Sequence, residues 1–417
     1  MPFQRAFNRI LTPIRREAQV TEGVGAIRRV QDASVDGRTV LVRVDYNVPM
    51  RDGCVTDDTR IRASLPTLTL LLDRGAKVIV ATHLGRPHGK IDPSLRLEPI
   101  SECLSEIMGR SVVQLDDCVG PKVAETIAAG EPGDLLMLEN LRFHPEESAN
   151  DREFAQQLAR LADLYVSDAF ATIHRTHAST LGVAEILPAY AGCLVQREVA
   201  SLGRLLDSPE RPYVAIVGGK KAASKLGPLR DLVGRVDRVI VGGGVAFSML
   251  AAQGASVGNS IVDESVFGEI LKILEAARAR GVEIALPIDA RISRELEPSA
   301  ETDVADASEI PEGWAGFDIG PKTAEVYRER ILDAKSIVWT GPMGAFETPP
   351  FDNGTRAIAE AVVNSDAFSV VGGGETGEAV ASLGHADGVS YISTGGGACL
   401  ALLRGKRLPA LEALREA

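Results

Sequence analysis

The chain has 417 residues, which is too long for one ordinary hydrophobic core and favours two domains. Hydrophobic residues make up 45% and charged residues 24% of the sequence, as in typical globular proteins. The net charge of -12 argues against nucleic acid or an anionic membrane as a general partner. Five scattered cysteines without a CxxC pair fit reduced thiols in a cytoplasmic protein, and we predict a structural role for all five.

Residues 1–22 differ in composition from the rest of the chain. Arginines alternate there with apolar residues, and no acid occurs before Glu17. Such a segment is typical of an organelle-targeting peptide, and the alternative is a simple extension or a start codon placed too far upstream. We favour the extension because the stretch is short and poor in serine. No apolar run approaches the roughly 20 residues that a membrane helix needs.

Short runs rich in valine and isoleucine predict buried strands throughout the first half of the chain, at 39–49, 76–85, 134–143 and 163–170. Helices are predicted at 63–75 and 152–163, the second from apolar residues at helical spacing. A long amphipathic segment at 194–212 runs into a turn that contains prolines. We therefore expect the division between two domains near residues 190–210.

The second half repeats this rhythm, with strands predicted at 213–219, 237–244, 283–289, 336–342, 368–374 and 390–397. A helix is predicted at 265–281. Alternation of strands and helices predicts a parallel sheet with helices on both faces, here twice over. The predicted fold class is therefore α/β, with two Rossmann-like lobes joined by a hinge helix.

Four glycine clusters end predicted strands, at 218–219, 242–244, 372–374 and 395–397. Glycine lets backbone N–H groups approach a ligand closely, and the N-terminus of a following helix favours an anion. Because the carboxyl ends of parallel strands share one edge of a sheet, four such clusters favour a phosphate-bearing ligand. The alternative is that the glycines only tighten turns. Neither GxxxxGK[ST] nor GxGxxG after the first strand occurs, which disfavours a P-loop and a dinucleotide site.

Basic residues gather in the first half, which contains five of the six histidines. Arg60, Arg86, Arg142 and Arg175 lie at or just beyond predicted strand ends or in adjoining turns. Guanidinium groups suit two-pronged binding of phosphate and carboxylate. The alternative is that each arginine is an ordinary solvated surface group.

Several long motifs resemble those of the phosphoglycerate kinase family in order and spacing. They are VLVRVDYNVP, DDTRIRASLPT, THLGRP, ENLRFHPEE, SDAFATIHRTHAST, VDRVIVGGGVAF, GFDIGPKT, WTGPMGAFE and STGGGA. The resemblance covers about residues 25–405. It implies an extension at 1–22, a phosphoglycerate-binding lobe at 23–195, a nucleotide-binding lobe at 196–403, and a C-terminal segment at 404–417 that returns to the N-terminal lobe.

The resemblance also implies substrate-binding residues in the N-terminal lobe, all of the expected type: Asp45, Asn47, Arg60, His83, Arg86, Arg142 and Arg175. Arg60 would orient the substrate carboxylate and stabilise the transferring group. The distal phosphate would be held by His83, Arg86, Arg142 and Arg175. Lys221 and Lys225 would reach the transferred phosphoryl group from the other lobe, and closure would exclude water.

For the nucleotide, ATP or ADP, the resemblance implies Gly218, Gly219, Lys221, Lys225, Gly243, Gly244, Pro342, Glu347, Gly373, Gly374, Glu375 and Thr376. Glu375 would be the residue associated with Mg²⁺. The catalytic positions implied are Arg60, Lys221, Lys225, Gly374 and Gly397.

The nucleotide-binding half departs from the family pattern at several positions. GGKKAASK stands for the usual GGAKVSDK, so Lys220 replaces a small residue and Ser224 replaces an acid. Thr340 stands where the family has asparagine, Glu375 stands where it has aspartate, and Glu378 replaces a small residue. One interpretation is compensated drift in an active enzyme. The other is a weakened paralogue that senses phosphoglycerate or uses another phosphoryl donor.

We expect an active kinase that interconverts ATP and 3-phosphoglycerate with ADP and 1,3-bisphosphoglycerate, with magnesium. It is expected to be a cytoplasmic monomer whose partners are small molecules. A non-catalytic phosphoglycerate sensor and a kinase for another small carboxylate are the alternatives.

Overall fold

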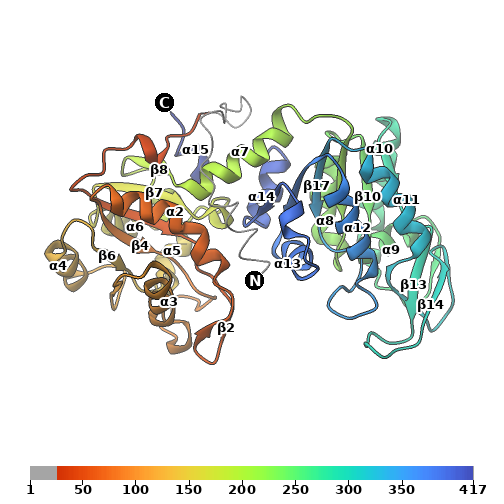
Figure 1. Cartoon of the computed structure of the whole chain (residues 1–417), viewed down its shortest axis with the longest axis horizontal. Coiled ribbons are helices and arrows are strands. Elements are labelled where there is room, and N and C mark those ends of the chain that lie inside the picture. Colours follow the sequence, from red (N-terminus) through yellow and green to blue (C-terminus); the bar gives the residue numbers. More distant parts are fainter. Residues whose placement is uncertain (1–25, 417) are drawn as a thin grey trace. The chain divides into compact units, whose positions relative to one another are not determined.

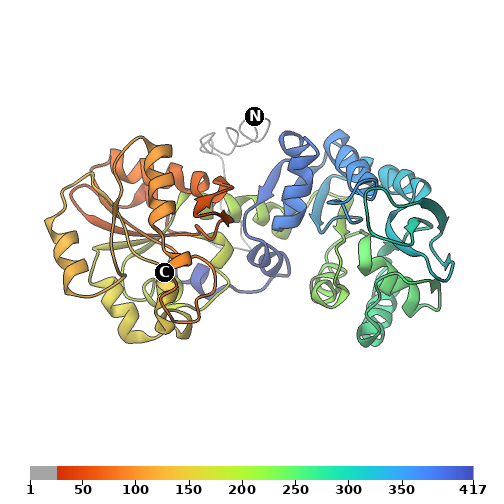
Figure 2. The same ribbon diagram turned by 90° about the horizontal axis from the view of Figure 1, so that it is seen from below.

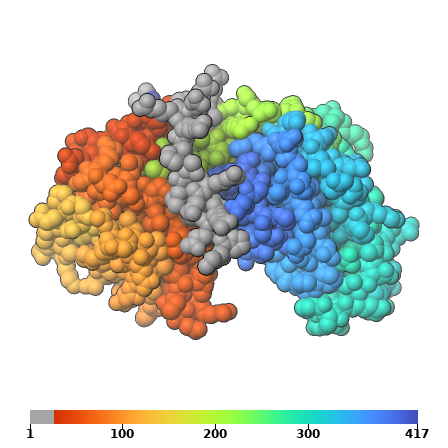
Figure 3. Space-filling model, in the orientation of Figure 1, coloured from red at the N-terminus to blue at the C-terminus, as the bar shows by residue number. Residues whose placement is uncertain are grey.

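The computed structural model describes residues 26–416, so the segment 1–22, whether targeting peptide or extension, lies outside the described residues. The chain divides into two compact units, one of residues 26–203 with 406–416 and the other of residues 204–405. Figure 3 shows their surfaces, with residues 26–203 mainly in red to yellow and residues 204–405 in green to blue. The chain passes from the first unit to the second within helix α7 (Cys193–Asp207).

A six-stranded parallel sheet forms the centre of the N-terminal unit, in the order β5-β6-β4-β1-β7-β8. Val42 in the middle of β1 lies between Val80 of β4 and Val166 of β7, and all three are fully buried. Burial on both faces explains why these strands are nearly continuous apolar runs. The strands are β1 (Thr39–Val44), β4 (Lys77–Ala81), β5 (Val113–Gln114), β6 (Leu135–Met137), β7 (Leu164–Asp168) and β8 (Ala189–Ala191).

Helices cover this sheet, and α2 packs against β4 (Figure 1). A short hairpin of β2 (Met50–Arg51) and β3 (Cys54–Val55) precedes α2. The helices of the unit are α2 (Thr59–Asp73), α3 (Glu98–Met108), α4 (Pro121–Ala129), α5 (Pro145–Ala149), α6 (Arg152–Ala159) and α15 (Pro409–Glu412).

The C-terminal segment packs against the first described residues of the chain. The backbone N–H of Arg28 donates to the carbonyl of Leu414 at 2.8 Å, and that of Glu416 donates to Ala26 at 3.1 Å. The guanidinium of Arg28 also donates to the carbonyl of Ala413 at 2.6 Å. Figure 2 shows this end of the chain among the elements of the N-terminal unit.

The C-terminal unit contains a second six-stranded parallel sheet, in the order β12-β10-β9-β17-β18-β19. Numbered along this unit, the order is 3-2-1-4-5-6, that of the Rossmann fold, and it reverses between β9 and β17. Open α/β sheets bind ligands at such a reversal, beyond the carboxyl ends of the strands. The strands are β9 (Tyr213–Val217), β10 (Arg238–Val241), β12 (Glu283–Ala285), β17 (Ser336–Thr340), β18 (Phe368–Gly372) and β19 (Tyr391–Ser393).

Seven helices of the described C-terminal unit accompany this sheet, and α11 packs against α12 (Figure 1). They are α8 (Ala222–Leu232), α9 (Gly243–Ala252), α10 (Phe267–Ala279), α11 (Pro321–Leu332), α12 (Asn353–Asn364), α13 (Gly374–Ser382) and α14 (Gly397–Leu403). Within residues 26–416, no helix is both long and apolar enough to cross a membrane.

An antiparallel sheet in the C-terminal unit has no counterpart in the predicted elements. It consists of β14 (Thr302–Asp306), β13 (Asp289–Ser293) and β16 (Ala315–Ile319), in that order. A separate two-stranded sheet is formed by β11 (Ser256–Val257) and β15 (Glu309–Ile310). Of the predicted strand at 283–289, residues 283–285 form β12, and only Asp289 belongs to the next strand, β13, which lies in the antiparallel sheet. Pro287 lies between them, and proline cannot donate to a strand ladder.

The α/β class with parallel sheets flanked by helices is thus confirmed in both units. The first strand is shorter than predicted, because it ends at Val44. Beyond it the backbone N–H of Tyr46 donates to the side chain of Thr82 at 2.9 Å, and Val48 donates back to Tyr46 at 2.8 Å. The chain therefore leaves the sheet and turns, and Asp45 and Asn47 lie in this turn.

Candidate functional site

Three loops meet at the carboxyl edge of the N-terminal sheet, after β1, β4 and β6. The side-chain oxygen of Asn47 accepts the N–H of Gly85 at 2.8 Å, and Arg142 donates to the carbonyl of Gly85 at 2.6 Å. Asn140 adds two bonds to Leu84, at 3.2 and 2.8 Å. These bonds fix loops that are distant in sequence against one another at the place where the predicted substrate residues occur.

Arg60 lies in the first turn of α2 and forms an ion pair with Asp45. The Asp45 side chain is 8% exposed and also accepts the N–H of Asn47 at 3.2 Å, whereas the Arg60 side chain is 36% exposed. A buried carboxylate thus orients a guanidinium that still presents N–H groups to solvent. Such an arrangement suits binding of a ligand carboxylate or phosphate.

His83 follows β4 and is 3% exposed. Burial lowers the pKa of His83 well below its usual value, and the charges of Arg43, Arg142 and Arg175 lower it further. Burial also lowers the pKa of Arg142 to about 10, with the charge of Arg175 as the next cause. Several cationic groups thus lie close together around a neutral imidazole, and a bound anion would relieve their mutual repulsion.

The remaining predicted substrate residues, Asn47 and Arg86, are exposed in the same loops. Arg86 directly follows Gly85, whose backbone is bonded on both sides to Asn47 and Arg142. The structure therefore places Arg86 on the loop that the other two residues anchor, with its guanidinium accessible to solvent.

Three buried polar residues that the sequence pattern did not indicate lie beneath this edge, namely Arg43, Glu147 and Ser179. Arg43 is 1% exposed and Glu147 is fully buried. Arg43 donates to Ser179 Oγ at 2.9 Å, and that hydroxyl donates to Glu147 at 2.6 Å. The available signal was the single charge in the otherwise apolar run VLVRV.

In the C-terminal unit, the loops after β9 and β17 meet at the reversal of strand order. Gly218 donates to the carbonyl of Thr340 at 2.8 Å, and Gly219 donates to that of Pro342 at 2.9 Å. A Cβ atom on Gly218 would lie 2.1 Å from the Pro342 oxygen, and Gly341 has φ +88° with no room for a side chain. These glycines are therefore required for close packing of backbone against backbone.

The cluster at 242–244 has the same packing role. Gly243 donates to the carbonyl of Met343 at 2.8 Å, and a Cβ atom on Gly244 would lie 2.3 Å from the oxygen of Lys220. By contrast, Gly374 at the first position of α13 has nothing within 4 Å of the space a side chain would occupy. Gly397 is exposed at the start of α14.

Lys225 extends from α8 toward the end of β17, where it donates to the Thr340 hydroxyl at 3.1 Å. Burial lowers the pKa of Lys225 below its usual value, and the carboxylate of Glu375 opposes this shift. Glu375 is exposed in the first turn of α13, and the next residue, Thr376, accepts the N–H of Gly341 at 2.6 Å. Both departures thus act on this lysine, Thr340 by a hydrogen bond and Glu375 by its charge.

Five other predicted or divergent residues of this region are exposed: Lys220, Lys221, Ser224, Glu347 and Glu378. Lys221 directly precedes α8, and its carbonyl accepts the Ser224 hydroxyl at 2.8 Å. Ser224 therefore satisfies a backbone group of the first helical turn, which is a task suited to a hydroxyl.

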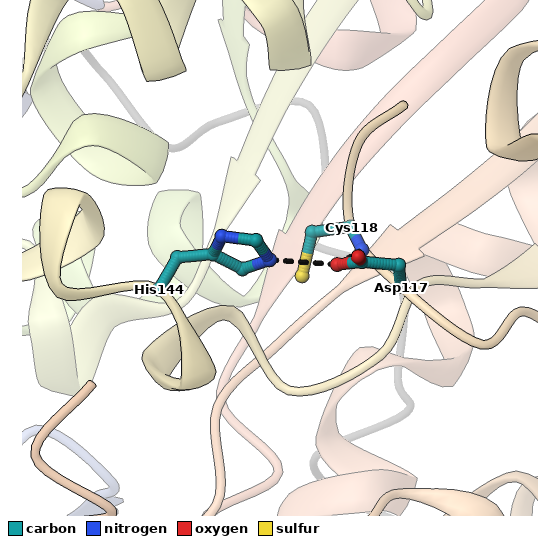
Figure 4. Close-up of side chains that lie close together, drawn as sticks. All are labelled: Asp117, Cys118 and His144. Atoms are coloured by element: carbon teal, nitrogen blue, oxygen red, sulfur yellow. Dashed lines mark hydrogen bonds and ion pairs between the residues drawn. The ribbon is translucent and has the colours of Figure 1, made fainter. Parts of the chain in front are cut away.

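The described residues contain one cluster of metal-ligand type, formed by Asp117, Cys118 and His144, whose ligand atoms lie within 4.8 Å of one another (Figure 4). His144 Nε2 and Asp117 Oδ1 are 2.6 Å apart, and the Cys118 thiol donates to the carbonyl of Glu139 at 2.9 Å. Burial raises the pKa of the Cys118 thiol well above its usual value, and the charge of Asp117 raises it further. The cluster is therefore satisfied by its own hydrogen bonds.

Comparison with known proteins gives one consistent result. A sequence model described as phosphoglycerate kinase matches residues 30–406. The phosphoglycerate kinase of Dictyoglomus turgidum is 48% identical over 388 residues, which are 93% of this chain and 98% of that protein. That of Moorella thermoacetica is 49% identical over 387 residues, with the same coverage.

Solved structures agree with the sequence comparison. The structure of phosphoglycerate kinase from Coxiella burnetii is similar with a TM-score of 0.85 and 39% identity, covering 93% of this chain and 98% of that one. The crystal structure of phosphoglycerate kinase from Pyrococcus horikoshii is similar with a TM-score of 0.80 and 34% identity, at the same coverage. The chain belongs to the phosphoglycerate kinase family.

Proposed function

We propose that the chain catalyses reversible phosphoryl transfer between ATP and the carboxylate of 3-phosphoglycerate, giving ADP and 1,3-bisphosphoglycerate. It is a phosphotransferase with a carboxyl group as acceptor, and ATP or ADP is its co-substrate. The observation that carries the proposal is the cluster of His83, Arg142 and Arg175 at one sheet edge in a chain of this family. That cluster is a site for a phosphate-bearing anion.

In the proposed substrate site, the Asp45–Arg60 pair orients the reacting carboxylate, and His83, Arg142 and Arg175 bind the distal phosphate. Asn47, in the loop after β1, and Arg86, in the loop after β4, complete the site. The hydrogen bond from the N–H of Gly85 to the side chain of Asn47 joins these two loops. The carboxylate oxygen attacks the terminal phosphorus of ATP in line, as the bond to the ADP oxygen breaks. Positioning and charge neutralisation supply the catalysis, because the protein forms no covalent bond in this step.

In the proposed nucleotide site, Lys221 and Lys225 neutralise the phosphate that is transferred. The glycines of the loops after β9, β10 and β17 pack these loops against one another at the strand ends, where the nucleotide would bind, with Pro342 and Glu347 in the third loop. Gly373, Gly374 and Thr376 open α13, whose first N–H groups have no acceptor within the helix and would donate to phosphate oxygens. Gly397 opens α14, where the N–H of Ala398 already donates to the carbonyl of Gly395 at 2.8 Å.

Glu375 is the residue we propose to hold Mg²⁺. Magnesium in kinases is commonly bound by one or two carboxylates together with substrate phosphates, so a single exposed carboxylate beside Lys225 and the start of α13 fits the ion. When bound, Mg²⁺ would neutralise charge on the nucleotide phosphates. The glutamate is one methylene longer than the aspartate that the family pattern has here.

We also propose that the enzyme acts as a monomer in the cytoplasm. Its substrates are small molecules, and the five cysteines, which all lie within residues 26–416, form no disulfide there, which is compatible with a reducing compartment. Size-exclusion chromatography with light scattering would test the monomer, and a second mass species at working concentration would contradict it.

A coupled assay with Mg-ATP and 3-phosphoglycerate tests the proposed function, with Arg60→Ala and Arg62→Ala as a matched pair. Both arginines lie in the first turn of α2, but Arg62 pairs with Asp58 instead of Asp45. Turnover that is lost only in Arg60→Ala would support the proposal. No turnover in the unaltered chain, with 3-phosphoglycerate still binding by calorimetry, would favour a sensor. A different acid that outcompetes 3-phosphoglycerate would contradict the substrate assignment.

A further inference from the structure

A positive charge lies in the interior of the N-terminal sheet. Arg43 is the fifth residue of β1, between Ala81 of β4 and Ser167 of β7, and only 1% of its surface is exposed. A buried cation is costly unless it is paired and fully hydrogen-bonded. Its neighbours in the strand are valines, so a function in simple packing does not explain an arginine at this position.

Each side of the Arg43 guanidinium has a partner that fixes its plane. Nη1 donates to the carbonyl of Val44, and Nε donates to Ser179 Oγ at 2.9 Å. Ser179 is in turn held by Glu147, whose two carboxylate oxygens accept the hydroxyl at 2.6 Å and the backbone N–H at 2.9 Å. Because the single hydroxyl proton goes to Glu147, Ser179 must act as the acceptor for Arg43.

Glu147 supplies the compensating charge. Burial alone would raise the pKa of Glu147, but this pKa is lowered overall by His177, whose Nδ1 lies 3.6 Å from Oε1, by the charge of Arg43 and by the hydrogen bonds from Ser179. Glu147 is therefore ionised, and the Ser179 hydroxyl bridges it to the buried guanidinium of Arg43. This bridge is rigid because both partners are held by backbone groups as well.

The remaining side of the guanidinium faces His83. Arg43 Nη2 lies 3.1 Å from His83 Nδ1. Arginine has five N–H donors, no acceptor, and does not lose its proton in proteins, so His83 Nδ1 must accept this hydrogen bond. An imidazole that accepts at Nδ1 is neutral and has its proton on Nε2. Nε2–H is then the one hydrogen-bond donor that the ring can offer to a ligand.

We propose that Arg43 is a positioning residue that locks His83 in the Nε2–H tautomer, so that a neutral imidazole donates to the distal phosphate of 3-phosphoglycerate. The inference rests on the proposed function for the ligand, but not for the tautomer. As a consequence, the neutral His83 would orient the bound phosphate by a directional hydrogen bond, and the arginines would neutralise the charge of that phosphate. Groups that face His83 are Arg43, Arg142, Arg175 and His177, together with Asp45, whose Oδ1 is 3.9 Å from Nδ1.

Nitrogen NMR of the unaltered, ligand-free chain tests the tautomer directly. In protein labelled at histidine nitrogen, with His83 assigned by comparison with His83→Asn, we expect Nδ1 to show an unprotonated shift and Nε2 a protonated one. Both shifts should stay constant from about pH 5 to pH 8, because protonation would place a second cation against Arg43. A protonated Nδ1, or titration of the ring within this range, would overturn the proposal.

A double-mutant cycle tests whether Arg43 acts through His83. Arg43→Lys keeps the charge but loses the planar fork, and we expect it to raise KM for 3-phosphoglycerate by up to about tenfold, with kcat changed much less. In a His83→Ala background the same change should alter KM by less than about twofold, since the interaction is already gone. Effects that multiply independently would show that Arg43 has only a structural role.

Ser179→Ala serves as a second variant if Arg43→Lys does not fold. It removes the acceptor of Arg43 Nε but leaves the backbone bond to Glu147. We expect a smaller rise in KM for 3-phosphoglycerate than in Arg43→Lys, and a mixture of the two His83 tautomers. An unchanged tautomer together with an unchanged KM would contradict the proposed coupling of Ser179 to His83 through Arg43. If the unaltered chain has no kinase activity, the proposed function is wrong. The NMR measurement would still decide whether Arg43 fixes the His83 tautomer.

Discussion

Lys225 Nζ donates a hydrogen bond to Thr340 Oγ1 across 3.1 Å, at the point where the strand order of the C-terminal sheet reverses. Thr340 is 1% exposed at the end of β17, and the lysine is partly buried on α8. The family pattern has asparagine at this position, so threonine preserves an oxygen acceptor while changing the side chain. The departure therefore retains the group that positions the lysine.

Thr340→Val is predicted to weaken nucleotide-dependent catalysis while preserving shape. Valine fills nearly the same volume but cannot accept the lysine N–H, and loss of a hydrogen bond to a charged group typically costs about 1.5–3 kcal/mol. We expect kcat/KM for ATP to fall by about tenfold or more. Steady-state kinetics at saturating 3-phosphoglycerate would measure the change.

Thr340→Ser and Thr340→Asn are the controls for this prediction. Both retain a side-chain oxygen, so we expect activity close to that of the unaltered chain, or modestly higher with asparagine. Equal losses in all three variants, with unchanged thermal unfolding, would mean that the hydroxyl does not position Lys225.

Glu375→Gln is predicted to raise the Mg²⁺ concentration needed for half-maximal rate. The change removes an exposed carboxylate near Lys225 but keeps the side-chain length, and we expect an increase on the order of fivefold. Glu378→Gln is the matched control, because it removes the same charge from an exposed position on the same helix. Similar Mg²⁺ profiles for both variants would contradict a specific role for Glu375. Glu375→Asp should retain or modestly raise turnover.

Asp168→Asn is predicted to make folding stability less sensitive to pH. Burial raises the pKa of Asp168 to about 7, against hydrogen bonds from Thr67, Leu194 and Val195 that lower it. Because this folded pKa is above the unfolded value, the stability contribution is present below about pH 4 and is lost as pH rises through 7. Relative to the unaltered chain, the variant should gain about 2 kcal/mol between pH 5 and pH 8.

Urea unfolding followed by far-ultraviolet circular dichroism at several pH values would measure this difference. Comparing the two chains at each pH removes the contribution of Asp318, a second carboxyl group whose pKa burial raises. Parallel stability profiles from pH 5 to pH 8 would show that Asp168 does not titrate in that range.

The architecture could be predicted from sequence because its signals are local. Apolar strand runs and amphipathic helices alternate in both halves, and this alternation gives parallel sheets covered by helices. The antiparallel sheet of β13, β14 and β16 was missed because β14 is largely exposed and because β13 and β16, although mostly buried, mix charged or polar residues with apolar ones. Register and strand order depend on contacts between distant segments, which periodicity does not encode.

In the candidate site too, local sequence signals could be interpreted, whereas features that depend on tertiary contacts could not. Residue type and position after a strand indicated Arg60, His83, Arg142 and Arg175, because sheet edges collect such residues. The function of a glycine could not be predicted in the same way, since Gly218 and Gly374 look alike in sequence. Gly218 packs against backbone, whereas Gly374 lies open at a helix start. Only the tertiary contacts distinguish the two uses.

Leu414→Ala is predicted to loosen the N-terminal unit at its first residues. Leu414 is fully buried, and its carbonyl accepts the N–H of Arg28 at 2.8 Å. Truncating a buried leucine typically costs about 2–5 kcal/mol, so we expect faster hydrogen exchange in peptides that cover residues 26–30. Ile186→Ala is the control, because Ile186 belongs to the same unit but is 45% exposed.

Both tryptophans lie in the other unit, at 314 and 339, so the tryptophan fluorescence of Leu414→Ala should change little. Unchanged exchange in residues 26–30 would mean that the C-terminal segment does not stabilise this end of the chain.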